Sequence, residues 1–167
     1  ATVRYGSDRT SIAPSRSRFD AGLIVTSLAA TWVSMADSSA DPRLCSLELI
    51  CQAEHDPDAA VALVTDDPDL LERVREVLGP EAEKAPRREI VMEALSQQGA
   101  LLLAEDWGSA LDFAREYAAE HLALFSRDPA ADLDRVPTAG TAFLGQAAAV
   151  AYGDYLTGAN HVLPTGG

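Results

Sequence analysis

Each of the three histidines in the chain lies beside polar residues that could do chemistry, and the first of them is His55. Gln52 precedes it by three residues, a spacing that puts both side chains on one face at the end of a helix. One oxygen donor and one nitrogen donor then point the same way, as in half of a zinc site. The same pattern also occurs at helix surfaces and helix ends without metal. The pair is therefore a candidate metal site that needs further ligands.

The second histidine, His121, directly follows Glu120, after a predicted helix and just before a predicted strand. A neighbouring carboxylate and imidazole can divide the removal and delivery of a proton near neutral pH. Active sites of open α/β sheets lie at strand ends, usually the carboxyl ends. A histidine at the end of a helix is also favoured by the helix dipole alone. The pair therefore allows a catalytic and a purely structural interpretation.

The third histidine, His161, lies in a glycine-containing stretch at residues 152–165 that also holds Asp154 and Asn160. Irregular backbone around an Asp and an Asn-His pair suits a loop shaped around a ligand. Neither standard spacing of a phosphate-binding glycine loop occurs in the sequence. We expect this stretch to contact a small molecule.

Length and charge limit what these groups can act on. The chain has 167 residues, 47% of them hydrophobic, which is enough for one domain with a substantial core. Its 13 basic and 26 acidic residues give a net charge of -13, which repels nucleic acids and anionic membrane surfaces. No apolar run is long enough to span a membrane. These properties predict a soluble globular domain that acts on a small-molecule substrate and binds neither nucleic acid nor membrane.

Apolar runs alternate with helical patterns along most of the chain. Strands that are separated by helices of ten or more residues pair in parallel, because a tight turn cannot join parallel neighbours. The fold class is therefore α/β, an open and mostly parallel sheet with crossover helices. Gly79-Pro80 is expected to end the second helix. The predicted strands are Gly22–Thr26, Thr31–Met35, Ala60–Thr65, Ala100–Ala104, His121–Phe125 and Ala139–Leu144, and the predicted helices begin at Pro42, Pro68, Pro86 and Asp106.

The first 35 residues differ from the rest, because the first 18 contain four arginines against one aspartate and an apolar run at residues 21–36 follows them. This order imitates a secretory signal with a cleavage site at Ser34-Met35-Ala36, but the basic stretch is long for a signal. We interpret residues 1–35 as a basic arm leading into divergent strands, and residues 36–167 as the α/β domain. Cys45 and Cys51 are six apart in a predicted helix, so helical spacing does not bring them together. We expect buried, unpaired thiols and a cytoplasmic, reducing location.

The three histidine groups, in this order and at these separations, resemble the histidinol dehydrogenase family, whose zinc- and NAD-dependent members complete histidine synthesis. The likeness covers roughly residues 36–167, and its motifs are highly specific. It implies the fold of the family's catalytic half. The matching segments are Ala-Asp-Ser-Ser-Ala-Asp-Pro at 36–42, residues 49–58, Glu-Tyr-Ala-Ala-Glu-His-Leu at 116–122, Ala-Gly-Thr-Ala-Phe-Leu-Gly at 139–145, and residues 153–165.

The resemblance also implies a role for each candidate residue. The implied site comprises the metal ligands Gln52, His55 and Asp154, the catalytic pair Glu120 and His121, and the substrate-binding residues Asn160 and His161. In this assignment the catalytic pair transfers protons and activates water. The three groups then belong to one site.

Several departures from the family pattern limit this assignment. The family's nucleotide-binding domain has no counterpart before the likeness, so we expect no NAD binding by this chain alone. The family's substrate-contacting Gly-Pro-Ser-Glu segment is not intact, and Ala119 and Ala159 replace two prolines. A fourth zinc ligand in the family is a histidine from the partner subunit, whereas all three histidines here are already assigned. An amide, an imidazole and one carboxylate predict only modest zinc affinity.

Three functions are compatible with these observations. The first is an NAD-independent enzyme that uses Glu120 and His121 for hydrolysis, dehydration or ring closure of a small amino-acid-derived substrate. The second is a partial or partner-dependent form of a zinc- and NAD-dependent histidinol dehydrogenase. The third is a non-catalytic module that binds a metal or an imidazole-like ligand. We also expect a homodimer, formed partly through residues 21–36, because the domain leaves apolar surface uncovered.

Overall fold

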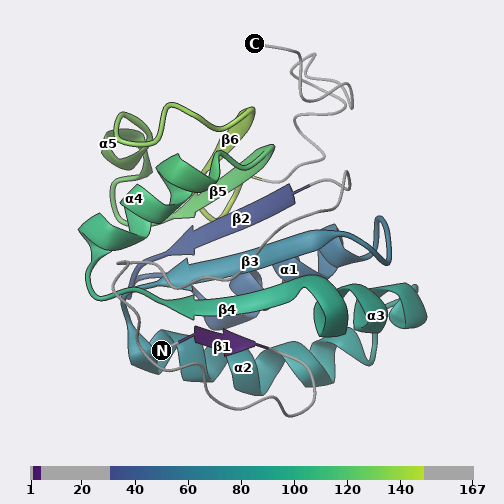
Figure 1. Ribbon diagram of the computed structural model, residues 1–167. Helices are drawn as coiled ribbons and strands as arrows, with labels where there is room; N and C mark the ends of the chain where they lie inside the picture. The colour runs from purple at the N-terminus through teal and green to yellow at the C-terminus, as the bar shows by residue number, and fades with distance from the viewer. Residues whose placement is uncertain (1, 5–30, 149–167) are drawn as a thin grey trace.

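The computed structural model describes residues 2–4 and 31–148. These residues form a six-stranded sheet with helices on both faces (Figure 1). The order of the strands is β1-β4-β3-β2-β5-β6; only β1 is antiparallel to its neighbour. The predicted α/β class with a mostly parallel sheet is confirmed. The strands are β1 (Thr2–Arg4), β2 (Thr31–Ala36), β3 (Ala60–Thr65), β4 (Gly99–Leu103), β5 (His121–Phe125) and β6 (Thr141–Leu144). The helices are α1 (Pro42–Ala53), α2 (Pro68–Ala82), α3 (Arg88–Gln98), α4 (Trp107–Tyr117) and α5 (Pro129–Leu133).

The order of the strands reverses at β2. The chain adds β3 and then β4 on one side of β2, and α4 then carries it back to place β5 on the other side. Helices α1, α2 and α3 pack on one face of the sheet, while α4 packs on the opposite face (Figure 1). This is a doubly wound sheet, in which ligands usually bind at the carboxyl ends of the strands, near the point where the order reverses.

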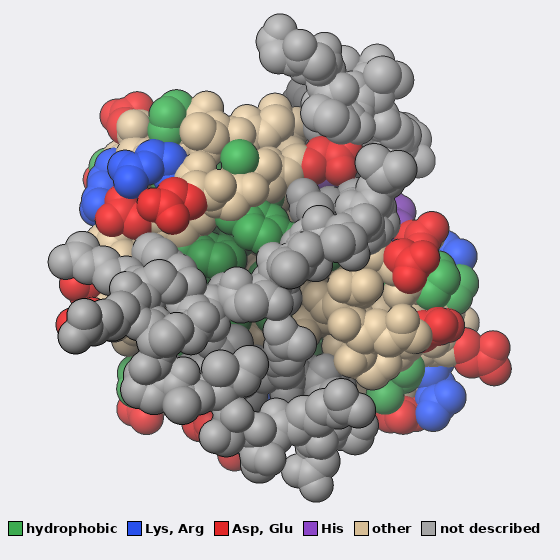
Figure 2. Space-filling model, in the orientation of Figure 1, with side chains coloured by type: hydrophobic (Ala, Val, Ile, Leu, Met, Phe, Trp, Pro, Cys, Tyr) green, Lys and Arg blue, Asp and Glu red, His purple; other side chains and the backbone are tan. Residues whose placement is uncertain are grey.

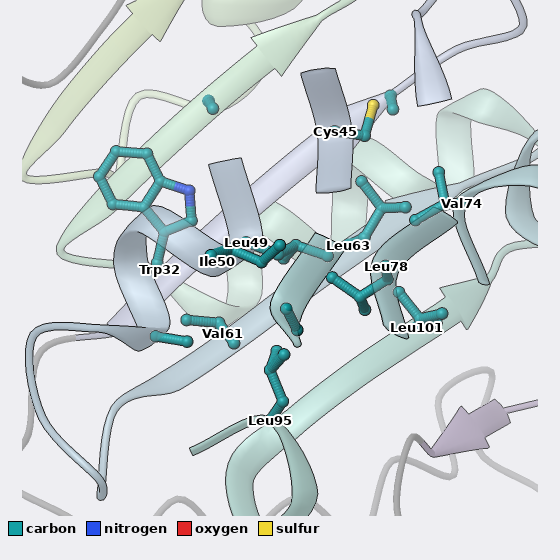
Figure 3. Close-up of a cluster of buried hydrophobic side chains, with 14 of the residues drawn as sticks. Trp32, Cys45, Leu49, Ile50, Val61, Leu63, Val74, Leu78, Leu95 and Leu101 are labelled. Atoms are coloured by element: carbon teal, nitrogen blue, oxygen red, sulfur yellow. The ribbon is translucent and has the colours of Figure 1, made fainter. Parts of the chain in front are cut away.

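The two faces of the sheet carry separate apolar layers because side chains alternate along each strand. The first layer joins alternate strand residues such as Trp32, Val61 and Leu63 to α1, α2 and α3 (Figure 3). The second layer joins the intervening residues, such as Val33 and Leu124, to α4. Alternation therefore assigns every residue of a strand to one of two faces.

Aspartates cap four of the described helices, α1, α2, α4 and α5. Asp41 accepts hydrogen bonds from the backbone N–H groups of Arg43 and Leu44, and Asp67 accepts one from Asp69. A proline follows each of these two caps, where its missing N–H has no helical partner to lose. Asp106 caps α4 in the same way, through the N–H of Ser109.

Two local predictions are wrong. Helix α2 does not end at Gly79-Pro80 but continues to Ala82, which is fully buried, and the N–H of Glu83 bonds to the carbonyl of Gly79 across the proline. Packing of this last turn outweighs the proline's missing donor. Cys45 is buried as expected, but Cys51 is exposed, because it lies about half a turn around α1 from the buried Leu49. Both thiols are unpaired.

Sequence reasoning did not find two elements, the antiparallel strand β1 and the short helix α5. The predicted strand Gly22–Thr26 and most of the basic arm lie outside the described residues. Among the helices of the described part, none has the length and apolar character needed to cross a membrane. On the face shown in Figure 2, acidic side chains predominate over basic ones, consistent with the net charge of -13.

Candidate active site

His121 begins β5 at the amino edge of the parallel sheet, by which we mean the edge where the parallel strands start. Its register partners are Trp32 of β2 and Thr141 of β6, and Trp32 in turn pairs with Val61 of β3. All four residues lie at or next to the start of their strands. The catalytic candidate is thus at the amino edge, whereas doubly wound sheets usually bind ligands at the carboxyl edge.

Aromatic rings hold the imidazole of His121. The ring stacks on the indole of Trp32 with centroids 5.1 Å apart and planes inclined by 23°, and the Phe143 ring lies 6.2 Å away. The Trp32 indole is itself fixed, because it is 3% exposed and its Nε1 donates to Ser34 Oγ at 3.1 Å. His121 is half-buried. The imidazole therefore has a defined plane and an accessible part.

The backbone of Glu120 is fixed from the neighbouring strand. The N–H of Thr141 donates to the Glu120 carbonyl at 2.9 Å, and the N–H of Gly140 donates to the Ala119 carbonyl at 3.1 Å. A Cβ at position 140 would lie 2.8 Å from the Glu120 carbonyl oxygen, so this approach requires glycine. The start of β6 thereby sets the position from which the half-buried Glu120 extends.

Gln52 and His55 lie at the end of α1, in different surroundings. Gln52 is in the last turn and 7% exposed, and its Nε2 donates to Glu48 Oε1 at 3.0 Å. His55 follows the C-cap and is exposed, and its backbone N–H bonds to the Gln52 carbonyl at 3.3 Å. Burial raises the pKa of Glu48, and the hydrogen bond from Gln52 only partly offsets this. The carboxylate that accepts from Gln52 was not predicted from the sequence, although its spacing of four residues on one helix was visible.

The end of α1 and His121 share one face and one edge of the sheet. Alternation along β5 puts His121 on the same face as Ala123 and Phe125, which belong to the apolar layer under α1. Trp32 and Ala53 belong to that same layer, and α1 leads into β3 at the amino edge. Asp154, Asn160 and His161 lie outside the described residues. Two of the three histidine groups thus lie on one face and at one edge of the sheet, and the convergence of all three groups in one site stays a prediction.

The two described metal candidates fit a zinc site by the chemistry of their donors. The carboxylate of Glu48 occupies the nitrogen end of the Gln52 amide, which leaves the oxygen end for another partner, and His55 offers an exposed imidazole. Within residues 31–148, His, Cys, Asp and Glu side chains form no group of three or more that could hold a metal ion. A complete site therefore needs a ligand from elsewhere, such as the predicted Asp154.

The carboxyl edge of the sheet is also polar, but its groups bind one another. Asp37 accepts hydrogen bonds from the backbone N–H groups of Ser39 at 2.8 Å and Arg127 at 2.9 Å. The Arg127 guanidinium donates to Ser38 Oγ at 3.2 Å. Burial, together with three neighbouring carboxylates, raises the pKa of Asp66 at the same edge. The hydrogen bonds of Asp37 and Arg127 join the segments that follow β2 and β5.

The fold and the site define a doubly wound α/β protein with a Glu-His pair and two metal candidates on one edge. Residues 30–167 match the family model for histidinol dehydrogenase, and the chain belongs to this family. It is 48% identical to the histidinol dehydrogenase of Haloarcula marismortui over 80% of this chain and 32% of that protein. It is 43% identical to that of Methanothermobacter thermautotrophicus, over 80% of this chain and 31% of that one.

A solved structure agrees with the sequence relatives. The crystal structure of histidinol dehydrogenase from Elizabethkingia anophelis matches with a TM-score of 0.76 and 32% identity, covering 81% of this chain and 31% of that one. The chain thus spans about a third of the length of the relatives that it matches. The expected family resemblance is confirmed.

Proposed function

We propose that this chain carries the acid–base and metal-binding part of a histidinol dehydrogenase active site. The observation that carries the proposal is the position of His121, which lies on the same sheet face and edge as the end of α1 with Gln52 and His55. Glu120 and His121 would move protons on a histidinol-like substrate, one group as acid and the other as base. The relatives, which are histidinol dehydrogenases, indicate the substrate class.

Each candidate residue has a physical reason for its part. Stacking on Trp32 restricts the His121 ring to one plane, so its nitrogens keep a fixed direction toward a bound molecule. Gln52, His55 and Asp154 would hold zinc, with Asn160 and His161 contacting substrate. Zinc, when bound, supplies Lewis-acid polarisation of a substrate atom. We assign no residue of this chain to NAD.

The names of the relatives favour dehydrogenation, the second of the three functions expected from the sequence, over non-redox chemistry. Hydrolysis, dehydration and ring closure stay predictions, and the same assay addresses them. Product formed from histidinol only when NAD is present supports the dehydrogenase. Product formed without NAD supports the non-redox enzyme.

The test compares substitutions in the pair with one beside it. Glu120→Gln and His121→Asn should each lower turnover of histidinol by about 10²–10⁴-fold while the circular dichroism spectrum is unchanged. Glu116→Gln is the matched control, because Glu116 is an exposed carboxylate at the end of α4, four residues before Glu120. If Glu120→Gln and His121→Asn both turn over histidinol like the wild type, the proposed acid–base pair is wrong. Where turnover is too slow to measure, titration calorimetry of histidinol against wild type and His121→Asn tests whether His121 contacts the substrate.

A homodimer and a cytoplasmic location are further parts of the proposal. The expected dimer contact involves residues 21–36, of which only residues 31–36 are described. Light scattering coupled to size exclusion should give twice the mass of 17.7 kDa. A mass of one chain at micromolar concentration would contradict the dimer. The location rests on the two unpaired cysteines and stays a prediction.

A further inference from the structure

A carboxylate one helical turn earlier holds one end of the Gln52 side-chain amide. Nε2 of Gln52 donates to Oε1 of Glu48 at 3.0 Å, and both residues belong to α1. Gln52 is 7% exposed and Glu48 is half-buried, so water competes only in part for this bond. Removing the acceptor would leave a shielded donor unsatisfied, which is unfavourable.

This bond decides which end of the amide faces away from Glu48. Only the oxygen of an amide has lone pairs for a cation, because the nitrogen carries two hydrogens and donates. Turning the Gln52 amide by half a rotation would bring its oxygen against the Glu48 carboxylate, with two acceptors facing each other. The hydrogen bond therefore keeps the nitrogen on Glu48 and leaves the oxygen directed elsewhere.

The same pair occurs a second time, on α3, where it is exposed to water. Nε2 of Gln97 donates to Oε1 of Glu93 at 3.1 Å, again with a spacing of four residues. Both side chains are exposed, so water can replace either partner. The two pairs share spacing, chemistry and distance, and they differ in burial and in their place relative to His121.

We propose that Glu48 is a positioning residue that orients the Gln52 amide so that its oxygen is presented as a metal ligand. The inference rests on the proposed function, in which Gln52 binds zinc. A group that holds a metal ligand in its orientation typically contributes about ten- to a hundredfold to metal affinity. Glu48 itself stays bonded to the amide nitrogen and does not contact the metal.

Two substitutions at position 48 separate orientation from charge. Glu48→Met removes the acceptor but keeps the length and helix propensity of the side chain, and zinc affinity should fall about ten- to a hundredfold. Glu48→Gln removes the charge, yet its own oxygen can still accept from Gln52, so it should retain most of the affinity. Glu93→Met removes the matched acceptor on α3 and should leave zinc affinity unchanged. Affinities are measured on the full chain with a chelating indicator that competes for zinc.

A second measurement needs no metal. In the zinc-free wild type, the side-chain NH₂ of Gln52 should be ordered by nitrogen-15 relaxation, whereas that of Gln97 should have an order parameter below about 0.6. Glu48→Met should make the Gln52 NH₂ as mobile as that of Gln97. Unchanged order in this variant would overturn the role of Glu48 directly, even if the variant binds zinc poorly for another reason.

The outcomes distinguish this inference from the function on which it rests. Equal zinc affinity of wild type and Glu48→Met overturns the positioning role and leaves Gln52 as a ligand. Equal losses in Glu48→Met and Glu48→Gln show that charge alone matters, which also overturns the positioning role. Failure of the wild type to bind zinc overturns the metal assignment of Gln52 itself, and the positioning role with it. A weakened Glu48→Met with nearly intact Glu48→Gln and Glu93→Met supports the inference.

Discussion

The two edges of the parallel sheet use polar residues in different ways. At the carboxyl edge, the Asp37 carboxylate accepts from the backbone N–H of Arg127 and the Arg127 guanidinium donates to Ser38, which ties the ends of β2 and β5 together. At the amino edge, His121 lies against aromatic rings, and His55 is exposed. Doubly wound sheets commonly bind ligands at the carboxyl edge. The comparison shows that polar residues at a strand end can hold the backbone, as Asp37 does, so polarity at a strand end does not by itself indicate a ligand site.

The largest expected loss of stability comes from removing the indole of Trp32, on which the His121 imidazole stacks at the amino edge. Trp32→Ala should lower the free energy of unfolding by about 3–5 kcal/mol, because a nearly buried indole leaves a cavity in the layer under α1. Trp32→Phe, which retains a ring for stacking, should lose much less. Urea denaturation measures both, and the His121 ring signals in NMR should move further in Trp32→Ala. Equal stabilities of the two variants would contradict the assigned stacking.

The carboxyl edge should respond to acid through Asp37. Burial by itself would raise the pKa of Asp37, but hydrogen bonds from Ser39 and Arg127 outweigh it and hold the pKa below its ordinary value of 3.8. A carboxyl group whose folded pKa is lowered stabilises the fold above its unfolded value, and this stability is lost as the pH falls from about 4 through the lowered folded value.

Asp37→Asn tests this dependence. The variant should lose about 1.5–3 kcal/mol at neutral pH, the usual range for hydrogen bonds to a charged group. Its stability should then decline less than that of the wild type as the pH falls below about 4, as followed by denaturation at each pH. If the stabilities of the two proteins fell by the same amount with pH, the hydrogen-bonded role of Asp37 would be contradicted.

Substituting one glycine at each edge compares the two edges directly. Gly140 precedes β6 at the amino edge, and an added Cβ would lie 2.8 Å from the Glu120 carbonyl oxygen. Gly140→Ala should therefore cost about 1–3 kcal/mol and shift the amide resonance of Glu120. Gly145 follows β6 at the carboxyl edge with φ +82° and open space around it, so Gly145→Ala should cost about 1 kcal/mol from its backbone alone. A larger loss of stability in Gly145→Ala than in Gly140→Ala would contradict the close contact described at Gly140.

The smallest effect is a gain in stability at the amino edge. Ala118 ends α4 with φ 51°, in the left-handed region where an alanine Cβ is crowded. Ala118→Gly should stabilise the protein by about 0.5–1 kcal/mol, because glycine is the usual residue at this position after a helix. Thermal unfolding measures the gain. A lower melting temperature would show that the added freedom of the unfolded chain outweighs the strain.

Strong local patterns predicted most of the described fold. Asp41-Pro42 and Asp67-Pro68 mark the starts of α1 and α2, and the apolar run at residues 60–65 forms β3 with the predicted bounds. The predicted end of α2 at Gly79-Pro80 was wrong because packing outweighs local preference there: the helix continues through Pro80 to the buried Ala82. The short helix α5 has too few residues to show a period. The strand β1 pairs with a segment far along the chain, which no local pattern contains.

The candidate site was predictable only in part. Residue types and spacing indicated Glu120, His121, Gln52 and His55, and the family resemblance joined them. Their common face follows from strand register and alternation, which pair Trp32 with His121 across a large separation in sequence. The supporting residues Trp32 and Glu48 were not predicted, because stacking and amide orientation depend on three-dimensional contacts.

The central position of β2 affects how the chain can fold while it is being synthesised. Its two neighbours are β3, which follows soon after it, and β5, which begins only at His121. On the ribosome, β2 and β3 can pair early, but one side of β2 has no partner until Phe125 has emerged. Unpaired strand borders attract other chains, so we expect the nascent protein to be prone to aggregation during this interval.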